Sequence, residues 1–333
     1  MHLARVVLFF YTLHPSFLDT PFPARLECLL RLWHSAEMKA TPSLIQNLTS
    51  PETFTHAFTF VLGLLVGSFL NVCISRLPKE NPAERSIVKP RSRCSKCMAP
   101  IAWYDNIPLL SYLLLVGKCR ACKARISPVY PTVELLTGLL FLACLMMFGM
   151  SWAALKWAVF CCVLIVLVFT DMFDRILPDP VNYFGLAAGL VLSFFFEPAD
   201  GTAEWIARKL FSFPPPSPVL SFVEALFGAA LGGGLLWLVG EVYLKWRGRE
   251  GMGFGDMKMM AMVGAFLGPQ RTFLTILAGS LLGSILGLMF ILVRRKGSEY
   301  ELPFGTFLGV AALLVVFFGT PVVDWYLRTA GIR

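Results

Sequence analysis

Two short acidic stretches hold the residues best suited to catalysis in this chain of 333 residues. One, at 251–258, reads Gly-Met-Gly-Phe-Gly-Asp-Met-Lys and places Asp256 behind alternating glycines at the start of an apolar run. The other, at 171–179, places Asp171 at the end of another apolar run. A carboxylate beside hydrocarbon is costly to desolvate, so each is a candidate functional residue. Together they can activate a water and polarise a peptide carbonyl, which predicts aspartic-type hydrolysis.

Each acid also has a purely structural explanation. Asp256 suits the cap of a helix that starts at Met257, with Gly253 and Gly255 shaping a turn. In the functional interpretation, those glycines let a substrate backbone approach, and the helix N-terminus favours a charged Asp256. Asp171, at a helix C-terminus beside hydrocarbon, is expected to have its charged form disfavoured. We therefore expect one charged and one protonated acid, with coupled titrations.

Other residues compete for these roles or support them. Asp174 and Asp179 are rival partners for Asp256, and Asp171 is preferred because it lies nearest the predicted membrane surface. Lys258 joins Gly253 and Gly255 as a supporting residue. No Ser/His/Asp or Cys/His arrangement is predicted, and the H-E-x-x-H signature is absent. All four histidines precede or begin the first apolar span: His2, His14, His34 and His56.

Four of the nine cysteines form two C-x-x-C pairs, Cys94 with Cys97 and Cys119 with Cys122. Two such pairs are typical of a structural Zn²⁺ site, in which four thiolates form a tetrahedral shell at about 2.3 Å. Disulfides are the alternative, but thiols stay reduced in the cytoplasm, where charge places this loop. A closed four-thiolate shell has no open position for water, so the metal is expected to organise the loop. Neighbouring basic residues can offset its charge or contact lipid phosphates.

The composition predicts an all-α polytopic membrane protein. The residues are 56% hydrophobic and 15% charged, with a mean hydropathy of +0.68, whereas soluble domains have about 25% charged residues. Several windows of about 20 residues carry no charge, enough to cross roughly 30 Å of hydrocarbon. The net charge of +8 does not require a nucleic acid partner, because the basic residues cluster in loops beside the spans.

The chain divides into four predicted segments. Residues 1–55 form an N-terminal extension without a clear pattern, and Met38 is an alternative start. Residues 56–76 hold the first transmembrane helix, 77–130 the cytoplasmic four-cysteine zinc loop, and 131–333 the transmembrane peptidase domain. About eight transmembrane helices are expected in total. After the first, they lie near 131–150, 152–170, 180–197, 217–243, 257–269, 272–293 and 304–323.

The distribution of basic residues predicts the orientation of the spans. The zinc loop has eleven Lys and Arg against three acidic residues between Arg76 and Arg125, which places it in the cytoplasm. Alternating spans then put 171–179, 244–256 and 294–303 on the same side, and the last two of these loops are also basic. Both acids are therefore expected at one membrane face.

The chain resembles the type IV prepilin peptidases, the leader peptidases and N-methyltransferases of type IV pilus and type II secretion systems. The likeness runs from about Gly63 to the last predicted span. It comprises, in order, Gly67-Ser68-Phe69-Leu70-Asn71-Val72, Arg76-Leu77-Pro78, Arg91-Ser92, Trp103-Tyr104-Asp105-Asn106-Ile107-Pro108, Ser111-Tyr112, Gly117-Lys118-Cys119, Tyr130-Pro131, Glu134-Leu135, both acidic stretches and Pro303-Phe304-Gly305. Thr306 stands where the family often has proline.

The resemblance implies an aspartic intramembrane peptidase of the bacterial inner membrane, with Asp171 and Asp256 as its catalytic pair at the cytoplasmic face. It implies prepilin and pseudopilin substrates with a short basic leader, cut before an apolar helix, typically between Gly and Phe. It also implies methylation of the new N-terminal amine with S-adenosylmethionine, associated with the zinc-loop region. No G-x-G-x-x-G follows a strand, so methylation depends on the resemblance alone. The sequence gives no basis for an oligomeric state.

Two other classes of function are weighed against a peptidase. A zinc-loop scaffold within a secretion assembly would function without either aspartate. A proton-coupled transporter would need carboxylates near the middle of its spans, whereas Asp171 and Asp256 both lie at the ends of predicted spans. The peptidase is the preferred prediction.

Overall fold

The computed structural model describes residues 50–88, 91–196, 200–210, 216–248, 251–294, 303–329 and 331. The alternative start at Met38, and most of the predicted extension, lie outside these residues. Regular structure in the described residues is helical, apart from two isolated antiparallel bridges in the cysteine loop. The all-helical fold class is confirmed.

Six helices of the described chain are long and apolar enough to cross a membrane. They are α3 (Pro51–Arg76), α6 (Val129–Phe148), α7 (Trp152–Asp174), α10 (Ser217–Arg247), α11 (Phe254–Arg294) and α12 (Phe304–Thr329). The shorter helices are α4 (Pro82–Arg85), η2 (Trp103–Asn106), α5 (Leu110–Leu114), α8 (Asp179–Ser193) and α9 (Thr202–Leu210). This is a multi-pass membrane protein.

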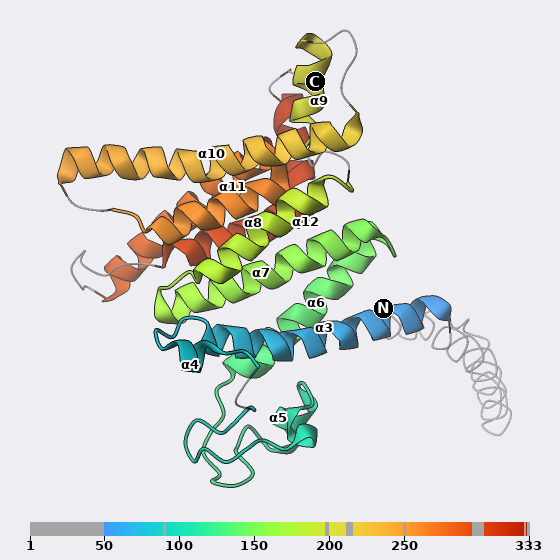
Figure 1. Ribbon diagram of the computed structural model, residues 1–333, viewed down its shortest axis with the longest axis vertical. Coiled ribbons are helices and arrows are strands. Elements are labelled where there is room, and N and C mark those ends of the chain that lie inside the picture. The colour runs from blue at the N-terminus through green and yellow to red at the C-terminus, as the bar shows by residue number, and fades with distance from the viewer. Residues whose placement is uncertain are drawn as a thin grey trace, which may run out of the picture. The chain divides into compact units, whose positions relative to one another are not determined.

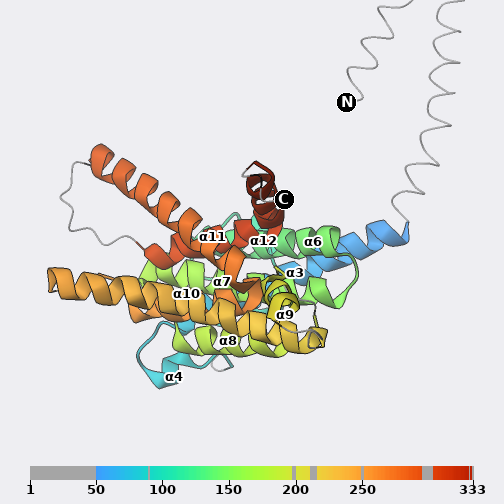
Figure 2. The same ribbon diagram turned by 90° about the horizontal axis from the view of Figure 1, so that it is seen from above.

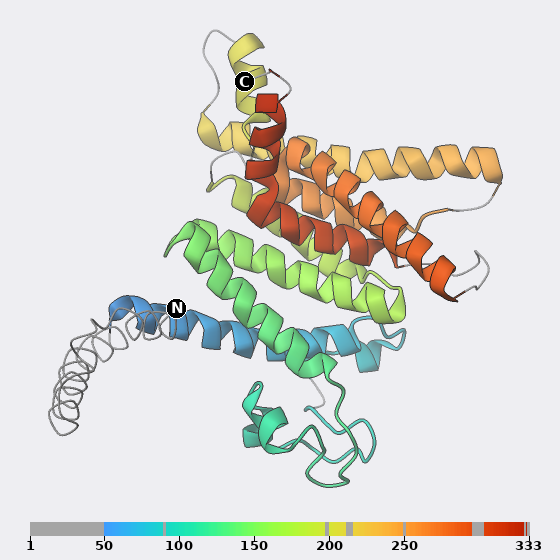
Figure 3. The same cartoon turned by 180° about the vertical axis from the view of Figure 1, so that it is seen from behind.

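The difference from about eight expected spans has two physical causes. The span expected at 180–197 is α8, whose 15 residues extend only about 22 Å and do not reach across the hydrocarbon alone. The spans expected at 257–269 and 272–293 are two arms of α11, which breaks at Gly268. Gly268 has a φ of 76° and precedes Pro269, whose fixed φ begins the second arm. That arm turns back toward the side where the first began (Figures 1 and 3).

The central helix of the bundle is α7. It lies between α6 on one side and α8 and α12 on the other (Figures 1 and 3), and seen from above it lies behind α10 (Figure 2). It begins where the Ser151 hydroxyl accepts the Ala154 N–H, and it ends at Arg175, whose φ of 54° is left-handed. Phe160 of α7 packs on Phe266 of α11 with ring centroids 4.7 Å apart. The first half of α7 is therefore buried in the core, and Asp171 near its C-terminal end is buried as well.

Helices α10 and α11 approach each other closely through glycines. A Cβ on Gly228 would lie 2.1 Å from the Gly264 carbonyl oxygen, and one on Gly232 would lie 2.1 Å from that of Met260. Small residues allow such backbone contact between membrane helices. By contrast, a Cβ on Gly234, also in α10, would meet nothing within 4 Å.

We expect Gly228→Ala to lower the thermal stability of the protein, because the new methyl group must push α10 and α11 apart. Overpacking of this kind costs about 1–3 kcal/mol. Gly234→Ala is the matched control and should leave the melting temperature unchanged or raise it, since alanine favours helix. Thermal unfolding of both variants in detergent measures the difference. Equal melting temperatures would contradict the close packing.

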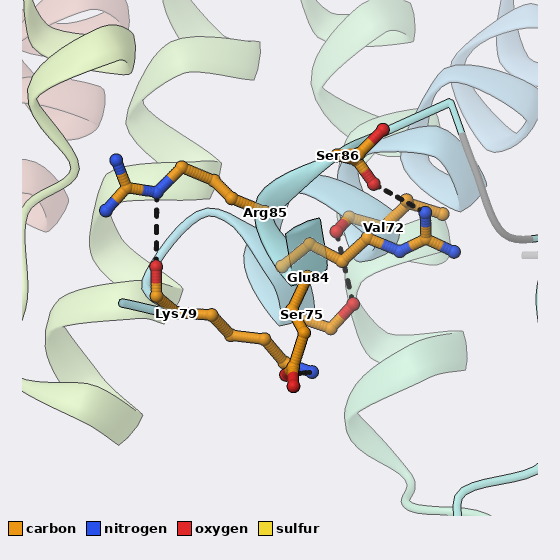
Figure 4. Close-up of polar contacts among 7 residues, drawn as sticks. Val72, Ser75, Lys79, Glu84, Arg85 and Ser86 are labelled. Carbon is orange, nitrogen blue, oxygen red and sulfur yellow. Dashed lines mark hydrogen bonds and ion pairs between the residues drawn. The ribbon is translucent and has the colours of Figure 1, made fainter. Parts of the chain in front are cut away.

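Polar contacts fold the chain back on the end of α3 (Figure 4). The Arg76 guanidinium donates to the Ser86 carbonyl at 2.7 Å, and Arg85 donates to the Lys79 carbonyl at 3.1 Å. Lys79 pairs with Glu84 at 3.0 Å. Helix α4 is thereby fixed beside the last turn of α3.

A buried polar cluster lies at the opposite end of α7 from Asp171. Glu224 of α10 accepts the backbone N–H groups of Asp200 and Ala203 at 2.8 and 3.2 Å. Asp200 accepts the N–H of Gln270 at 2.6 Å, just after the break in α11. Lys156 of α7 lines one small cavity with Glu224, about 22 Å along the helix from Asp171. This cluster stabilises the starts of α9 and of the second arm of α11.

Candidate active site and metal centre

The two predicted acids meet where three helix ends converge. Asp171 lies in the last turn of α7 and Asp256 in the first turn of α11, and they are 6% and 9% exposed. A Cβ on Gly305, in the first turn of α12, would lie 2.9 Å from Asp256 Oδ1 and 3.1 Å from Asp171 Oδ2. Both carboxylates therefore face one point, and only glycine fits between them without a shift.

Asp171 also contacts the start of α12 directly. Its Oδ2 accepts hydrogen bonds from the backbone N–H of Thr306 at 2.6 Å and from the Thr306 hydroxyl at 2.9 Å. That N–H belongs to the first turn of α12, whose donors have no partner within the helix. Asp171 thus caps α12 from another helix, and the positive end of the α12 dipole faces its carboxylate.

Asp256 has a different set of neighbours. It receives a hydrogen bond from the backbone N–H of Gly253. Leu177 forms an apolar wall beside both acids, because its side chain lies 3.0 Å from the Cβ positions of both Gly255 and Gly305. Gly255 therefore lets Leu177 pack closely next to Asp256, while Gly253 is exposed.

The surroundings of Asp171 differ from those expected on the sequence. The C-terminus of α7 alone would disfavour charge on this residue. The structure adds the N-terminus of α12 and two donors on one oxygen, which stabilise a negative charge there. Proline at position 306 would provide neither donor. Thr306, and with it Gly305, therefore join the candidate site, although the sequence did not indicate them as site residues.

The rival acids and Lys258 lie apart from this meeting point. Lys258 donates to Asp179 Oδ1 at 2.7 Å and lies 5.3 Å from the centre of the Tyr183 ring. It therefore joins α11 to α8. Asp179 is 54% exposed in its side chain, and Asp174 is exposed as well.

The four predicted metal ligands also come together. The sulfur atoms of Cys94, Cys97, Cys119 and Cys122 all lie within 4.8 Å of one another, and those of Cys94 and Cys122 are 3.8 Å apart. Four sulfurs at 2.3 Å from a tetrahedral centre lie about 3.8 Å from one another. All four are free thiols. The cluster has the size and donor set of a tetrahedral metal site.

The two cysteine pairs are held in matching backbone turns. The Cys94 N–H donates to the Ala99 carbonyl at 2.9 Å, and the Cys119 N–H to the Ala124 carbonyl at 2.8 Å. The residue after the second cysteine of each pair, Met98 or Lys123, has a left-handed φ of 58°. The loop thus presents two similar cysteine turns to one centre.

Backbone donors favour the metal-binding form of one of the four ligands, Cys94. The backbone N–H groups of Cys97 and Lys96 lower the pKa of the Cys94 thiol to about 6. This favours the thiolate, which is the metal-binding form.

An ion pair ties the second cysteine turn to η2. Arg120, between Cys119 and Cys122, donates through Nε and Nη2 to the two oxygens of Asp105 at 2.8 and 2.6 Å. The guanidinium holds the pKa of Asp105 below its ordinary value and lies 5.5 Å from the centre of the Tyr104 ring. The bidentate geometry fixes η2 beside the metal ligands.

Comparison with known proteins divides the chain at the α6–α7 connection. Residues 61–148, which hold the cysteines, match the bacterial peptidase A24 N-terminal domain. Residues 158–288, which hold both acids, match the type IV leader peptidase family. The chain is 36% identical over 294 residues to a prepilin leader peptidase/N-methyltransferase of Pseudomonas aeruginosa, covering 83% of this chain and 94% of that protein. The chain belongs to the type IV leader peptidase family.

Other members of the family support the same assignment. A prepilin leader peptidase/N-methyltransferase of Myxococcus xanthus is 41% identical over 247 residues, covering 73% of this chain and 66% of that protein. One from Aeromonas hydrophila is 34% identical over 291 residues, with 81% and 93% covered. No solved structure matches the chain. The leader peptidase match ends at residue 288, before Gly305 and Thr306.

Proposed function

We propose that this leader peptidase cleaves prepilins and pseudopilins by aspartic-type hydrolysis, with Asp171 and Asp256 as its catalytic pair. The observation that carries the proposal is the position of the two carboxylates, both within about 3 Å of one point at Gly305. Two acids in contact with one small space can share a water and a peptide carbonyl. The family and the names of the relatives support the choice of substrate.

The neighbours of each acid support a different role for each in this proposal. Asp171, with two donors on Oδ2, is the charged carboxylate that takes a proton from the attacking water. Asp256, beside the apolar Leu177 side chain, is the protonated acid, which reverses the assignment expected from the sequence. It gives its proton to the carbonyl oxygen as the water oxygen bonds to the carbonyl carbon. When the tetrahedral intermediate collapses, the C–N bond breaks and the leaving amine takes the proton held by Asp171. Asp256 regains its proton from the hydroxyl oxygen, which restores the pair.

The membrane position of the site suits a substrate with a basic leader and an apolar helix. Asp171 and Asp256 lie in the last turn of α7 and the first turn of α11, where an embedded peptide reaches the bilayer surface. Helices α3 and α10 each end in a basic last turn, at Arg76 and at Arg247. By the positive-inside rule we place these ends, the cysteine loop and the acids at the cytoplasmic face of the bacterial inner membrane.

We infer that the cysteine cluster holds structural Zn²⁺ and that the protein also methylates the new N-terminus with S-adenosylmethionine. Cys94, Cys97, Cys119 and Cys122 would hold the ion, which would fix the loop, because four thiolates leave no position for substrate. The transferase activity is supported by the names of the relatives. No residue is proposed to bind the methyl donor.

Purified protein incubated in detergent with a synthetic prepilin tests both activities. We expect a product that lacks the leader, and with S-adenosylmethionine a product heavier by one methyl group. Mass spectrometry reports the two changes separately. An intact substrate after incubation with folded, metal-loaded protein would overturn the peptidase proposal, and an unmethylated product would overturn the transferase proposal.

We expect Thr306→Val to lower the kcat for cleavage roughly 10-fold, with KM little changed. The substitution keeps the shape and the backbone N–H but removes the hydroxyl donor to Asp171 Oδ2. A hydrogen bond to a charged group is worth about 1.5–3 kcal/mol, and a loss in kcat alone indicates an interaction of the catalytic step.

Thr306→Ser is the matched control for this variant. It keeps both donors and should restore the wild-type kcat. Melting temperatures of both variants show whether packing is preserved. A Thr306→Val protein with wild-type kcat, or a Thr306→Ser protein as slow as the valine variant, would contradict the role of the hydroxyl.

A further inference from the structure

The segment around α5 exposes an unusual amount of apolar surface. We define the α5 face as Trp103, Leu110, Leu113, Leu114 and Val116; Leu113, Leu114 and Val116 are 71%, 73% and 77% exposed, and Trp103 is 81% exposed. No charged residue occurs at 107–116. Leaving such side chains in water forgoes the favourable free energy of burying their apolar surface. A contiguous apolar surface of this kind marks a binding surface.

The α5 segment is anchored on a membrane helix. The Leu109 N–H, immediately before α5, donates to Glu134 Oε2 of α6 at 2.9 Å. The Ser68 side chain of α3 also hydrogen-bonds Glu134. Glu134 Cα lies only 2.8 Å from the Cβ position of Gly67. Glu134 therefore lies inside the contact between α3 and α6. The hydrogen bonds from Leu109 and Ser68 stabilise its buried carboxylate.

Glu134, the residue that anchors the α5 segment, lies within the span α6 rather than at its end. Glu134 is five residues past the start of α6, about 7 Å along the helix. Its neighbour Gly67 is nine residues before Arg76, about 13 Å from the basic end of α3. Half the thickness of the hydrocarbon core is about 15 Å. The anchor is therefore less than half a hydrocarbon thickness from the ends of both helices.

We propose that the α5 face inserts among the acyl chains of one leaflet and docks the cysteine loop on an anionic phospholipid surface. The leaflet is the one near the two acids, since Ile74 at the end of α3 and Phe169 near the end of α7 pack in one core cluster. The proposal depends on the membrane class of the protein and not on the reaction assigned to the acids.

Two observations favour lipid as the occupant. Exposed apolar residues continue from the anchor along the membrane helices, with Leu135 and Leu139 of α6 and Phe69 of α3 between 42% and 50% exposed. Such side chains on spanning helices face acyl chains. Basic residues follow the α5 face directly, at Lys118, Lys123 and Arg125, and all three are exposed. Their charge complements anionic headgroups, and Trp103 suits the interface.

Photo-crosslinking of the full chain in phospholipid nanodiscs tests the proposal. The photoreactive residue p-benzoylphenylalanine replaces Val116 in one protein and Val88 in another. The two valines are equally exposed, at 77% and 78%, but Val88 follows the segment held at the end of α3 by Arg76 (Figure 4). The same residue at Phe69 calibrates the yield of lipid adducts. Nanodiscs contain phosphatidylethanolamine and phosphatidylglycerol.

We expect phospholipid adducts at position 116 comparable with those at 69, and at least about 10-fold fewer at 88, measured by mass spectrometry. Adducts at 116 with a second copy of the chain, or with added prepilin, would overturn the proposal in favour of a protein occupant. Equal lipid yields at 116 and 88, or none at 116, would overturn it as well. Cleavage assays on the same proteins report the reaction independently, so failure of one proposal is distinguishable from failure of the other.

Discussion

Asp171→Asn and Asp256→Asn are each expected to reduce prepilin cleavage by roughly 10²–10⁴-fold, the contribution typical of a positioned acid or base. Asparagine keeps the size of either side chain beside Gly305 but neither accepts the proton of water nor donates an acid proton. The rate of leader removal, followed by mass spectrometry with purified protein, measures the loss. Each variant should retain its metal, since the cysteines lie outside the region of the acids.

Asp174→Asn provides the matched control for this prediction. Asp174 belongs to the same acidic stretch but is exposed, so its substitution should leave cleavage intact. A pre-cleaved pilin peptide tests whether the aspartate variants still methylate, which separates loss of hydrolysis from loss of folding. Wild-type cleavage by Asp171→Asn or Asp256→Asn would exclude the pair, and loss of cleavage in Asp174→Asn alone would shift the role to that residue.

Cys94→Ser combined with Cys119→Ser is expected to remove the metal and loosen the loop at 77–130. Each substitution takes one thiolate from a different cysteine turn, and structural Zn²⁺ sites of this kind contribute about 10–16 kcal/mol of binding energy. Metal per protein should fall from one to near zero by elemental analysis. Limited proteolysis should show new cuts within the loop.

Cys73→Ala combined with Cys162→Ala is the matched control, because it also removes two thiols but neither is a predicted metal ligand. Both cysteines lie in membrane helices, in or against one core cluster, away from the metal ligands. This pair of substitutions should leave the metal content at one per protein. Full metal content in the Cys94 and Cys119 double variant would refute the four-thiolate assignment.

The class of fold follows from the sequence because membrane crossing depends on local properties. Long uncharged runs identify α3, α6, α7, α10 and α12 without knowledge of their neighbours. The C-x-x-C spacing likewise predicts the metal cluster, since two similar turns can present four thiols to one centre. The break in α11 is harder to predict from the sequence, because Gly268 and Pro269 lie within an apolar run. The left-handed φ of Gly268 depends on contacts in the folded protein.

The surroundings of the acids could not be predicted, because they depend on contacts between distant segments. Thr306 is 135 residues from Asp171, and nothing local to either residue indicates that α12 begins against α7. A prediction of the charge on Asp171 from the sequence therefore takes account of its own helix alone. Asp179 shows the same limit, since its pairing with Lys258 spans 79 residues and becomes visible only when α8 packs on α11.

Helix α5 lies between the two cysteine turns along the chain, while Glu134 lies beyond the second. An ion bound to all four cysteines would close the chain between the two cysteine turns into a ring. The ring would limit the distance between α5 and Glu134, and the conformational entropy that it removes from the unattached loop grows with the logarithm of ring size. Depletion of the metal in the cell would remove this cross-link without changing any transmembrane helix. The supply of metal would then regulate the affinity of the cysteine loop for the lipid surface, while the positions of Asp171 and Asp256 stay unchanged.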